Sequence, residues 1–270
     1  MSESPEQVIQ VSTQGAVRIL TLNRPTALNA FTAAMLASTR EALAEAAADS
    51  SVRAVVITGA GRAFSAGQDL GDPLVKPDPS PGAAPKDIGH LLDGYYIPLA
   101  LQLRAMPVPT IAAVNGVAAG AGANFALGCD LVIGGESASF IQAFSKIGLI
   151  PDCGGTWLLP RLVGRAKAMQ LALLGDKVKA AEAVSIGLIA RCVPDADLMS
   201  EAMATAQKLA AMPSRALAET RRLIDQAMDQ DFEDALRVEA MMQSQLGFAH
   251  DYSEGVQAFM DKRSPQFKDR

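Results

Sequence analysis

Hydrophobic and polar positions in the first half of the chain follow two alternating patterns. Short apolar runs bounded by Gly, Pro or Asn are typical of strands, and stretches with helical spacing separate them. Strands are predicted at residues 17–22, 52–58, 110–114 and 131–133. A helix rich in Ala and Leu is expected to begin at Asn29 or Thr32 and to run to about residue 49. Because such units repeat and several strands are uniformly apolar, we predict an α/β core whose strands are covered by helices.

Beyond about residue 165 the pattern becomes mostly helical. Helices are predicted at residues 165–174, 180–186, 197–211, 214–228, 231–246 and 253–262, with one strand at 189–193. We therefore divide the chain into a core of residues 1–195 and a helical C-terminal region of residues 196–270, which should pack on the core or on a neighbouring subunit. Residues 72–89 hold five prolines, and we expect them to form a mobile loop that covers a site.

Composition restricts the class of protein. Hydrophobic residues make up 49% of the 270 positions and charged residues 20%, which excludes long disordered stretches. No apolar run approaches the roughly 20 residues that a membrane-spanning helix needs, and the N-terminal MSESPEQ lacks a secretory signal pattern. Three cysteines cannot form a complete set of disulfides, which agrees with a reducing compartment. We therefore expect a cytoplasmic protein that does not associate with a membrane.

Charge and histidine content exclude two further classes. The 24 Lys and Arg against 29 Asp and Glu leave a formal net charge of −5. This balance argues against nucleic-acid binding but is compatible with an anionic small ligand, because local basic groups matter more than the total. The two histidines cannot form a multi-histidine cage, and no Cys/His spacing resembles a zinc site, so we expect no metal.

Two loops rich in small residues are candidates for chemistry. Residues 61–70 (GRAFSAGQDL) follow the second predicted strand, and residues 115–128 (NGVAAGAGANFALG) follow the third. Either loop alone is more often a matter of close packing. Together, two strand-end loops that each offer a backbone N–H predict an oxyanion hole. The patterns GxxxxGK[ST], GxGxxG and GxSxG are absent, which disfavours nucleotide hydrolysis, NAD chemistry and serine hydrolysis.

Asp152 is the third candidate. It lies between Pro151 and Cys153, within AFSKIGLIPDCGGTWLL, at the expected start of a helix. Its carboxylate could cap that helix by accepting the amide of Gly154 or Gly155. In so apolar a neighbourhood it could instead carry protons, with its pKa raised by desolvation. The residues themselves leave both interpretations open.

Five segments, in this order and spacing, resemble the crotonase (enoyl-CoA hydratase/isomerase) superfamily. They are NRPTALNAF at 23–31, AFSAGQDL at 63–70, AAVNGVAAGAG at 112–122, IPDCGGTWLLPRLVG at 150–164 and FMDKRSPQF at 259–267. The resemblance covers nearly the whole chain. It implies a spiral core of repeated ββα units and a helical C-terminal trimerisation region. It also implies an acyl-CoA thioester substrate, no cofactor beyond the coenzyme A within it, and assembly as a homotrimer or a dimer of trimers.

The resemblance also implies roles for individual residues. The amides of Gln68 and Ala121 would form the oxyanion hole for the thioester oxygen. Lys262 would lie near the CoA phosphates, of its own chain or of a neighbouring one. The implied substrate-binding positions, Lys262 included, are Arg24, Ala27, Ala66, Gly67, Asp69, Leu70, Gly122, Asn124, Phe144 and Lys262.

Departures from the superfamily pattern point to the reaction. Hydratases of this superfamily carry two glutamates that activate water, and the matching positions here hold Asn124 and Phe144. Hydration is therefore not expected. Isomerases of the superfamily place one acid at the position of Asp152, which makes Asp152 the expected catalytic residue. Phe140, Phe144 or Trp157 would form an apolar wall around the intermediate.

Within the superfamily, the segments are most similar to the isomerases that convert ring-1,2-epoxyphenylacetyl-CoA to an oxepin in phenylacetate catabolism. The same machinery could shift the double bond of 3-enoyl-CoA esters. The enzymatic alternatives are a thioester hydrolase, a dehalogenase or a ring-cleaving lyase in which Asp152 is a nucleophile, or a hydratase acting on another aromatic or enoyl-CoA. The non-enzymatic alternative is a subunit that binds CoA esters without catalysis.

Overall fold

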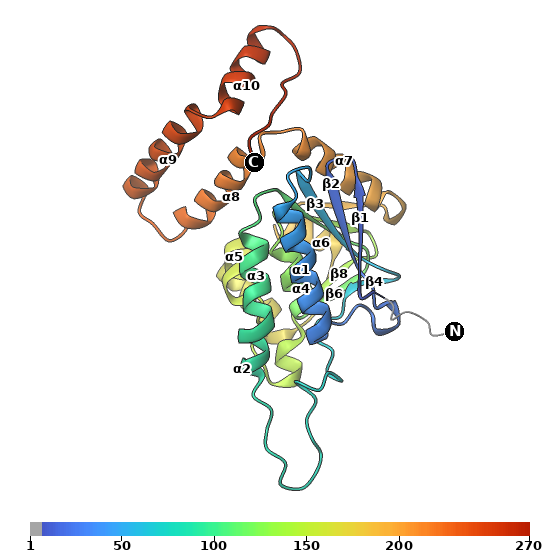
Figure 1. The fold of residues 1–270 in the computed structure, drawn as a ribbon. Helices are drawn as coiled ribbons and strands as arrows, with labels where there is room; N and C mark the ends of the chain where they lie inside the picture. The colour runs from blue at the N-terminus through green and yellow to red at the C-terminus, as the bar shows by residue number, and fades with distance from the viewer. Residues whose placement is uncertain (1–6) are drawn as a thin grey trace, which may run out of the picture.

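The strands form two sheets, and the chain passes repeatedly from one sheet to the other (Figure 1). The structure is a computed structural model and describes residues 7–270. The first sheet has the strand order β1 (Ile9–Gln14), β2 (Val17–Leu22), β3 (Ala54–Gly59), β5 (Thr110–Val114), β7 (Leu131–Gly135) and β10 (Arg191–Val193). The second has the order β4 (Ala63–Ser65), β6 (Val117–Ala119), β8 (Ser139–Ile141) and β9 (Lys177–Lys179).

Three consecutive strand pairs build the spiral. In β3–β4, β5–β6 and β7–β8, the first strand joins the first sheet and the second joins the other sheet. Strands β2, β3, β5 and β7 pair in parallel, which requires helical connections and a cover on both faces. The predicted α/β spiral of ββα units is confirmed.

The helices alternate with the strands up to β10, and α7–α10 come after it. They are α1 (Ala33–Ala48), α2 (Ile88–Leu91), α3 (Ile97–Arg104), α4 (Ala121–Leu127), α5 (Gly155–Leu174), α6 (Ala180–Ser185), α7 (Leu198–Ala210), α8 (Ser214–Ala227), α9 (Phe232–Gly247) and α10 (His250–Met260). A π-helical turn, η2 (Leu92–Tyr96), joins α2 to α3, and short 3-10 turns lie at η1 (Pro25–Ala27), η3 (Ala143–Ile147) and η4 (Asp195–Asp197). No helix among the described residues has both the length and the apolar character that crossing a membrane requires.

Strand β3 separates two hydrophobic cores. Val55 and Ile57 pack in the larger core with residues of α1, α3 and α4. Ala54 and Val56 point to the other face and pack with Ala202 and other residues of α7. Helix α7 therefore completes the core. Of the two packings predicted for residues 196–270, α7 shows packing on the core, whereas α8–α10, which we call the C-terminal arm, stand apart from the sheets in Figure 1.

Most predicted elements are confirmed, with shifts of a few residues at their ends. Thr32 caps α1, because its side-chain oxygen accepts the Met35 amide at 3.3 Å, whereas Asn29 lies in a left-handed turn before it. The strands of the second sheet, however, were largely missed. Each has only three residues, too few for an alternating pattern to appear.

Residues 72–87 form a loop, as predicted, and α2 begins at Ile88. Figure 1 shows it projecting from the body beside α2, and it does not lie over the sheets. Its first residue, Asp72, is buried and accepts the amides of Ala33 and Leu74, each at 2.9 Å. These bonds anchor the start of the loop to α1.

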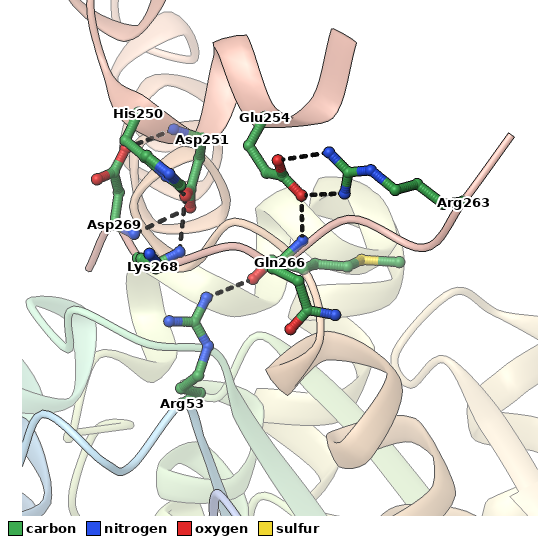
Figure 2. Close-up of polar contacts among 9 residues, drawn as sticks. Arg53, His250, Asp251, Glu254, Arg263, Gln266, Lys268 and Asp269 are labelled. Carbon is green, nitrogen blue, oxygen red and sulfur yellow. Dashed lines mark hydrogen bonds and ion pairs between the residues drawn. The ribbon is translucent and has the colours of Figure 1, made fainter. Parts of the chain in front are cut away.

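The C-terminal tail runs back along α10 and reaches the core. Asp251 accepts the amides of Lys268 and Asp269, and Glu254 pairs with Arg263 through both carboxylate oxygens, as Figure 2 shows. The last residue, Arg270, donates to the Ala46 carbonyl of α1 at 2.7 Å. In the same region Arg53 donates to the carbonyls of Ala210, which ends α7, and of Met212 just beyond it. The Arg270 contact ties the C-terminal tail to the core, and the Arg53 contacts hold the end of α7.

Asn29 holds the turn before α1 and gives a test of the fold. Its buried side chain donates to the carbonyls of Ala60 and Ala63 at 2.9 and 2.7 Å and accepts the Arg24 amide at 2.8 Å. Asn29→Ala leaves these backbone groups without partners, so we expect a loss of about 3 kcal/mol in urea unfolding. Thr26→Ala, at an exposed position of the same turn, should change stability by less than about 0.5 kcal/mol. Equal effects of the two variants would contradict this role.

Candidate active site

The loop after β4 carries the first of two adjacent backbone donors. Gly67 has a φ of +89°, and a Cβ atom at this position would lie 2.7 Å from the Ala119 carbonyl oxygen, so only glycine fits. Phe31 donates its amide to Gly67 O at 2.7 Å and accepts the Asp69 amide at 2.8 Å. The Gln68 amide between them has no acceptor among the described residues.

The second donor begins helix α4. Gly120 precedes it with a φ of +51°, and no side chain caps the helix, so the Ala121 amide has no acceptor in the described chain. A Cβ atom on Gly122 would lie 2.6 Å from the Ser65 carbonyl oxygen, and one on Gly67 would lie 3.5 Å from the Ala121 nitrogen. The two loops are therefore in backbone contact. This arrangement leaves the amides of Gln68 and Ala121 free for one anionic oxygen.

Arg24 and Asp69, predicted to bind substrate, pair with each other. The guanidinium and the carboxylate are 3.0 Å apart, each about one quarter exposed, and Asp69 also accepts the Gly71 amide at 2.9 Å. Their side chains join the 24–29 turn to the loop after β4, which is a positioning role. Leu70 is 56% exposed and offers an apolar surface beside them, while Ala27 and Ala66 are partly exposed on the same two turns.

Asp152 does not cap helix α5. The helix begins after Gly154, and the Gly155 amide donates to the backbone carbonyl of Asp152 at 2.8 Å, so the capping interpretation of the carboxylate is wrong. Its Oδ1 atom is buried and has no hydrogen-bond partner among the described residues. Burial raises the pKa of Asp152 to about 6, against a smaller lowering effect of its own backbone amide. A carboxyl group with such a pKa can both take and return a proton near neutral pH.

An apolar cavity of about 310 Å³ surrounds Asp152. Asp152 is the only acidic residue among the described residues that line it. The lining residues are Ile88, Leu92, Tyr96, Ile97, Ala100, Leu149, Ile150, Pro151, Asp152, Cys153 and Gly154. Burial raises the pKa of the neighbouring Cys153 thiol, so this group stays neutral and is a poor nucleophile. The cavity has the size and character of a site for a small apolar acyl group.

Asn124 positions Asp152, whereas the sequence predicted that it contacts substrate. The side chain is fully buried, and its Nδ2 donates to the Asp152 carbonyl at 2.8 Å. Its Oδ1 accepts Gln142 Nε2 at 2.8 Å. A Cβ atom on Gly155 would lie 2.2 Å from Asn124 Nδ2, so this contact needs a glycine there. Helix α4 thus carries the Ala121 amide and also holds the backbone of the candidate base.

The remaining residues predicted to form the apolar wall lie in different parts of the structure. Phe144 is buried, and its ring packs near Gly120 at the start of α4, so it forms an apolar wall there. Phe140 lies in the larger hydrophobic core. Trp157 is sandwiched between the guanidinium groups of Arg104 and Arg161, whose central carbons lie 4.2 and 4.0 Å from the ring centre. It lines a second cavity of about 600 Å³ under α8, so its predicted place in the wall around Asp152 is wrong.

Lys262 and Gly122 lie in different parts of the fold. Lys262 follows α10 at the end of the C-terminal arm and is not among the residues that line the cavity of Asp152. Gly122 packs against Ser65 and serves the contact between the two loops.

Tyr96 is a site residue that the sequence analysis missed. It is 1% exposed, lines the cavity of Asp152, and donates its hydroxyl to Gln68 Oε1 at 2.7 Å. The sequence offers no signal for it, because a tyrosine in a short apolar helix is ordinary and its partner is 28 residues away.

Comparison with known proteins agrees with this geometry. Residues 12–270 match the family described as enoyl-CoA hydratase/isomerase. The chain belongs to this family. A 1,2-epoxyphenylacetyl-CoA isomerase of Escherichia coli is 49% identical over 251 residues, 93% of this chain and 94% of that protein. A 2,3-dehydroadipyl-CoA hydratase of the same organism is 36% identical over 96% of this chain and 98% of that protein.

Solved structures of the family have the same fold. The crystal structure of an enoyl-CoA hydratase from Polaromonas sp. JS666 aligns with a TM-score of 0.89 at 34% identity, over 96% of this chain and 99% of that one. The family membership shows an acyl-CoA enzyme, and the two Escherichia coli relatives, named for different reactions, leave the reaction to be decided by the site.

The raised pKa of Asp152 predicts a stability effect. Between about pH 4 and pH 6 the folded chain holds a proton on Asp152 that the unfolded chain has lost, so the stability contributed by this group falls as pH rises through that window. Asp152→Asn removes the buried charge and should stabilise the protein by about 2 to 3 kcal/mol at pH 8, and by less at pH 5. Urea unfolding at both pH values checks this, with exposed Asp93→Asn as a control that should show no such difference. A destabilised Asp152→Asn at pH 8 would contradict the assignment.

Proposed function

We propose that this chain is an acyl-CoA isomerase that converts ring-1,2-epoxyphenylacetyl-CoA to the isomeric oxepin-CoA. The observation that carries the proposal is a single, partly buried carboxyl group, Asp152, in an apolar cavity, with a carboxamide and a phenyl ring at the two positions where hydratases of the family carry glutamates. One carboxyl group suffices for an isomerase, because the proton taken from one carbon returns to another.

The proposal assigns a group to each step of the reaction. The amides of Gln68 and Ala121 hold the thioester oxygen and stabilise the enolate that forms when the adjacent CH2 loses a proton. Asp152 takes that proton. The electrons of the enolate form a double bond from the α-carbon to the ring, and the carbon–carbon bond of the epoxide breaks while both carbon–oxygen bonds remain, which expands the ring to seven members. Asp152 returns the proton to the ring carbon that carries the displaced electron pair. Substrate and product are isomers, so no atoms, electrons or cofactor are exchanged with the surroundings.

Two further facts support an isomerase over a hydratase or a hydrolase. Activation of water calls for a second carboxylate, and Asn124, which occupies one of those positions, uses both ends of its amide on Asp152 and Gln142. The Escherichia coli relative at 49% identity is named for the epoxide substrate, which supports the aromatic acyl group. The same proton transfer would shift the double bond of a 3-enoyl-CoA ester to the 2-position.

Asp152→Asn tests the proposed base. The carboxamide fits the cavity but cannot accept the proton, so turnover of the epoxide thioester should fall by at least about 10²-fold, while the dissociation constant for phenylacetyl-CoA changes little. Absorbance and mass analysis of the product, with calorimetry for binding, measure the two quantities. Asp93→Asn should behave as the wild type. Turnover near that of the wild type in Asp152→Asn would remove Asp152 from the mechanism.

Two readouts separate the other reactions. In the wild type, kcat/KM should rise with pH through about 6, because only the ionised Asp152 takes a proton. If Asp152 were a nucleophile, as in a hydrolase or dehalogenase, its carboxylate would gain oxygen from ¹⁸O-water during turnover. Mass spectrometry of the peptide that contains Asp152 detects this, and we expect no incorporation.

The proposal includes assembly of the chain as a homotrimer or a dimer of trimers. The C-terminal arm exposes several large apolar side chains, and apolar surface that gathers into a large patch commonly marks a protein–protein contact. They include Ile224, Met228, Phe232, Phe248, Phe259 and Met260. In such an assembly Lys262 could reach the CoA phosphates of a neighbouring chain. Sedimentation should give a trimer or hexamer, and Phe248→Ser should weaken it while Val11→Ser, exposed on β1, should not. A stable wild-type monomer would overturn this part.

A further inference from the structure

Tyr96 places a polar group where the fold alone would favour an apolar one. Its ring packs edge-on against Phe31, with centroids 6.3 Å apart, and Phe31 packs in the same way against Phe125 at 5.7 Å. A phenylalanine would fill this aromatic cluster without the cost of burying a hydroxyl group. The hydroxyl of Tyr96 therefore calls for an explanation through its hydrogen bond.

That hydrogen bond ends on the residue that supplies an oxyanion donor. The Tyr96 hydroxyl donates to Gln68 Oε1 at 2.7 Å, and Gln68 Nε2 donates to the Asp69 carbonyl at 3.2 Å. Both ends of the Gln68 side chain are held, so the orientation of the Gln68 peptide is restrained as well. Burial, with a further contribution from the charge of Asp152, raises the pKa of Tyr96 well above its usual value, so the phenol stays protonated and remains a donor.

Tyr96 is also part of the acyl cavity. It lines the cavity together with Asp152, and it ends the π-helical turn η2 between α2 and α3, whose other residues include Leu92 of the same wall. Short π-helical turns are frequent at functional sites. One hydrogen bond thus connects the wall of the acyl cavity to the backbone donor for the thioester oxygen.

We propose that Tyr96 is a positioning residue, which sets the Gln68 amide for the thioester oxygen and couples this donor to the fit of the acyl group in the cavity. The proposal rests on the proposed function, because it takes the Gln68 amide as an oxyanion donor. It predicts an effect on the chemical step that exceeds any effect on binding, because preorganised donors matter most when charge develops on the oxygen.

The variant Tyr96→Phe tests this role directly. It keeps the ring and removes only the hydroxyl, so kcat should fall about tenfold, the rate equivalent of one hydrogen bond. The dissociation constant for phenylacetyl-CoA should change less than about threefold. The control is Tyr95→Phe, the adjacent tyrosine on η2, which is partly buried and lines a different depression beside α1. This control should leave both quantities unchanged.

A spectroscopic measurement separates positioning from a merely structural role. Bound phenylacetyl-CoA with ¹³C at its carbonyl should show a downfield shift that reports hydrogen bonds to the oxygen. Tyr96→Phe should reduce that shift, whereas Tyr95→Phe should not. Gln68→Met removes the acceptor from the other side of the bond. The double variant should lose little more activity than either single variant, because the two residues act as one unit.

These experiments test the role of Tyr96 separately from the proposed function. Phenylacetyl-CoA has no epoxide, so its carbonyl shift and the exchange of its α-protons in heavy water report the donors and Asp152 without any isomerisation. If the wild type shows the shift but does not convert the epoxide, the substrate assignment is wrong and Tyr96 is still tested. An unchanged shift and unchanged kcat in Tyr96→Phe, or fully multiplicative losses in the double variant, would overturn the positioning role.

Discussion

The candidate site depends on the contact between two backbone segments that only glycine permits. Gly67 meets the Ala119 carbonyl and Gly122 meets Ser65, each where a Cβ atom would lie closer than 3 Å. Because no side chain separates the loops, the amides of Gln68 and Ala121 lie beside each other without acceptors in the described part of the chain. Donors that the fold has already oriented need no rearrangement when charge develops on a thioester oxygen. The proposed proton transfer by Asp152 depends on this pair of donors to stabilise the enolate.

Helix α4 connects one of the two donors to the candidate base. Its first residue offers the Ala121 amide, and one turn later Asn124 holds the Asp152 carbonyl at 2.8 Å. Gln142 fixes the other end of the Asn124 amide, and Gly155 leaves room for it. Asn124 is thus a structural link between the start of α4 and the backbone of Asp152, the proposed base.

Much of the fold could be predicted from local pattern. Strands 17–22 and 110–114 have the predicted bounds, because burial of one or both faces gives a recognisable hydrophobic pattern in strands of five or six residues. Thr32 caps α1, as one of the two predicted starts of that helix. Strand β1 was missed because five of its six residues are exposed, so the strand has no buried face that would give an alternating hydrophobic pattern. Strands β4, β6 and β8 were missed because three residues show no period. The sequence left two packings open for α7, on the core or on another chain, because a small apolar face suits both, and the structure shows that it packs on the first sheet.

The sequence by itself determined the family, the two glycine loops and the choice of Asp152 as the candidate acid, because these depend on residue types at fixed spacing along the chain. Only the tertiary structure decided the contacts of each group. It showed that Asp152 Oδ1 is buried and unpartnered within the described residues, that Asn124 turns to the Asp152 backbone, that Arg24 and Asp69 pair with each other, and that Tyr96 reaches Gln68. These partners lie 28 to 45 residues apart, and burial and hydrogen bonding at such separations are properties of the packed chain that no local pattern encodes.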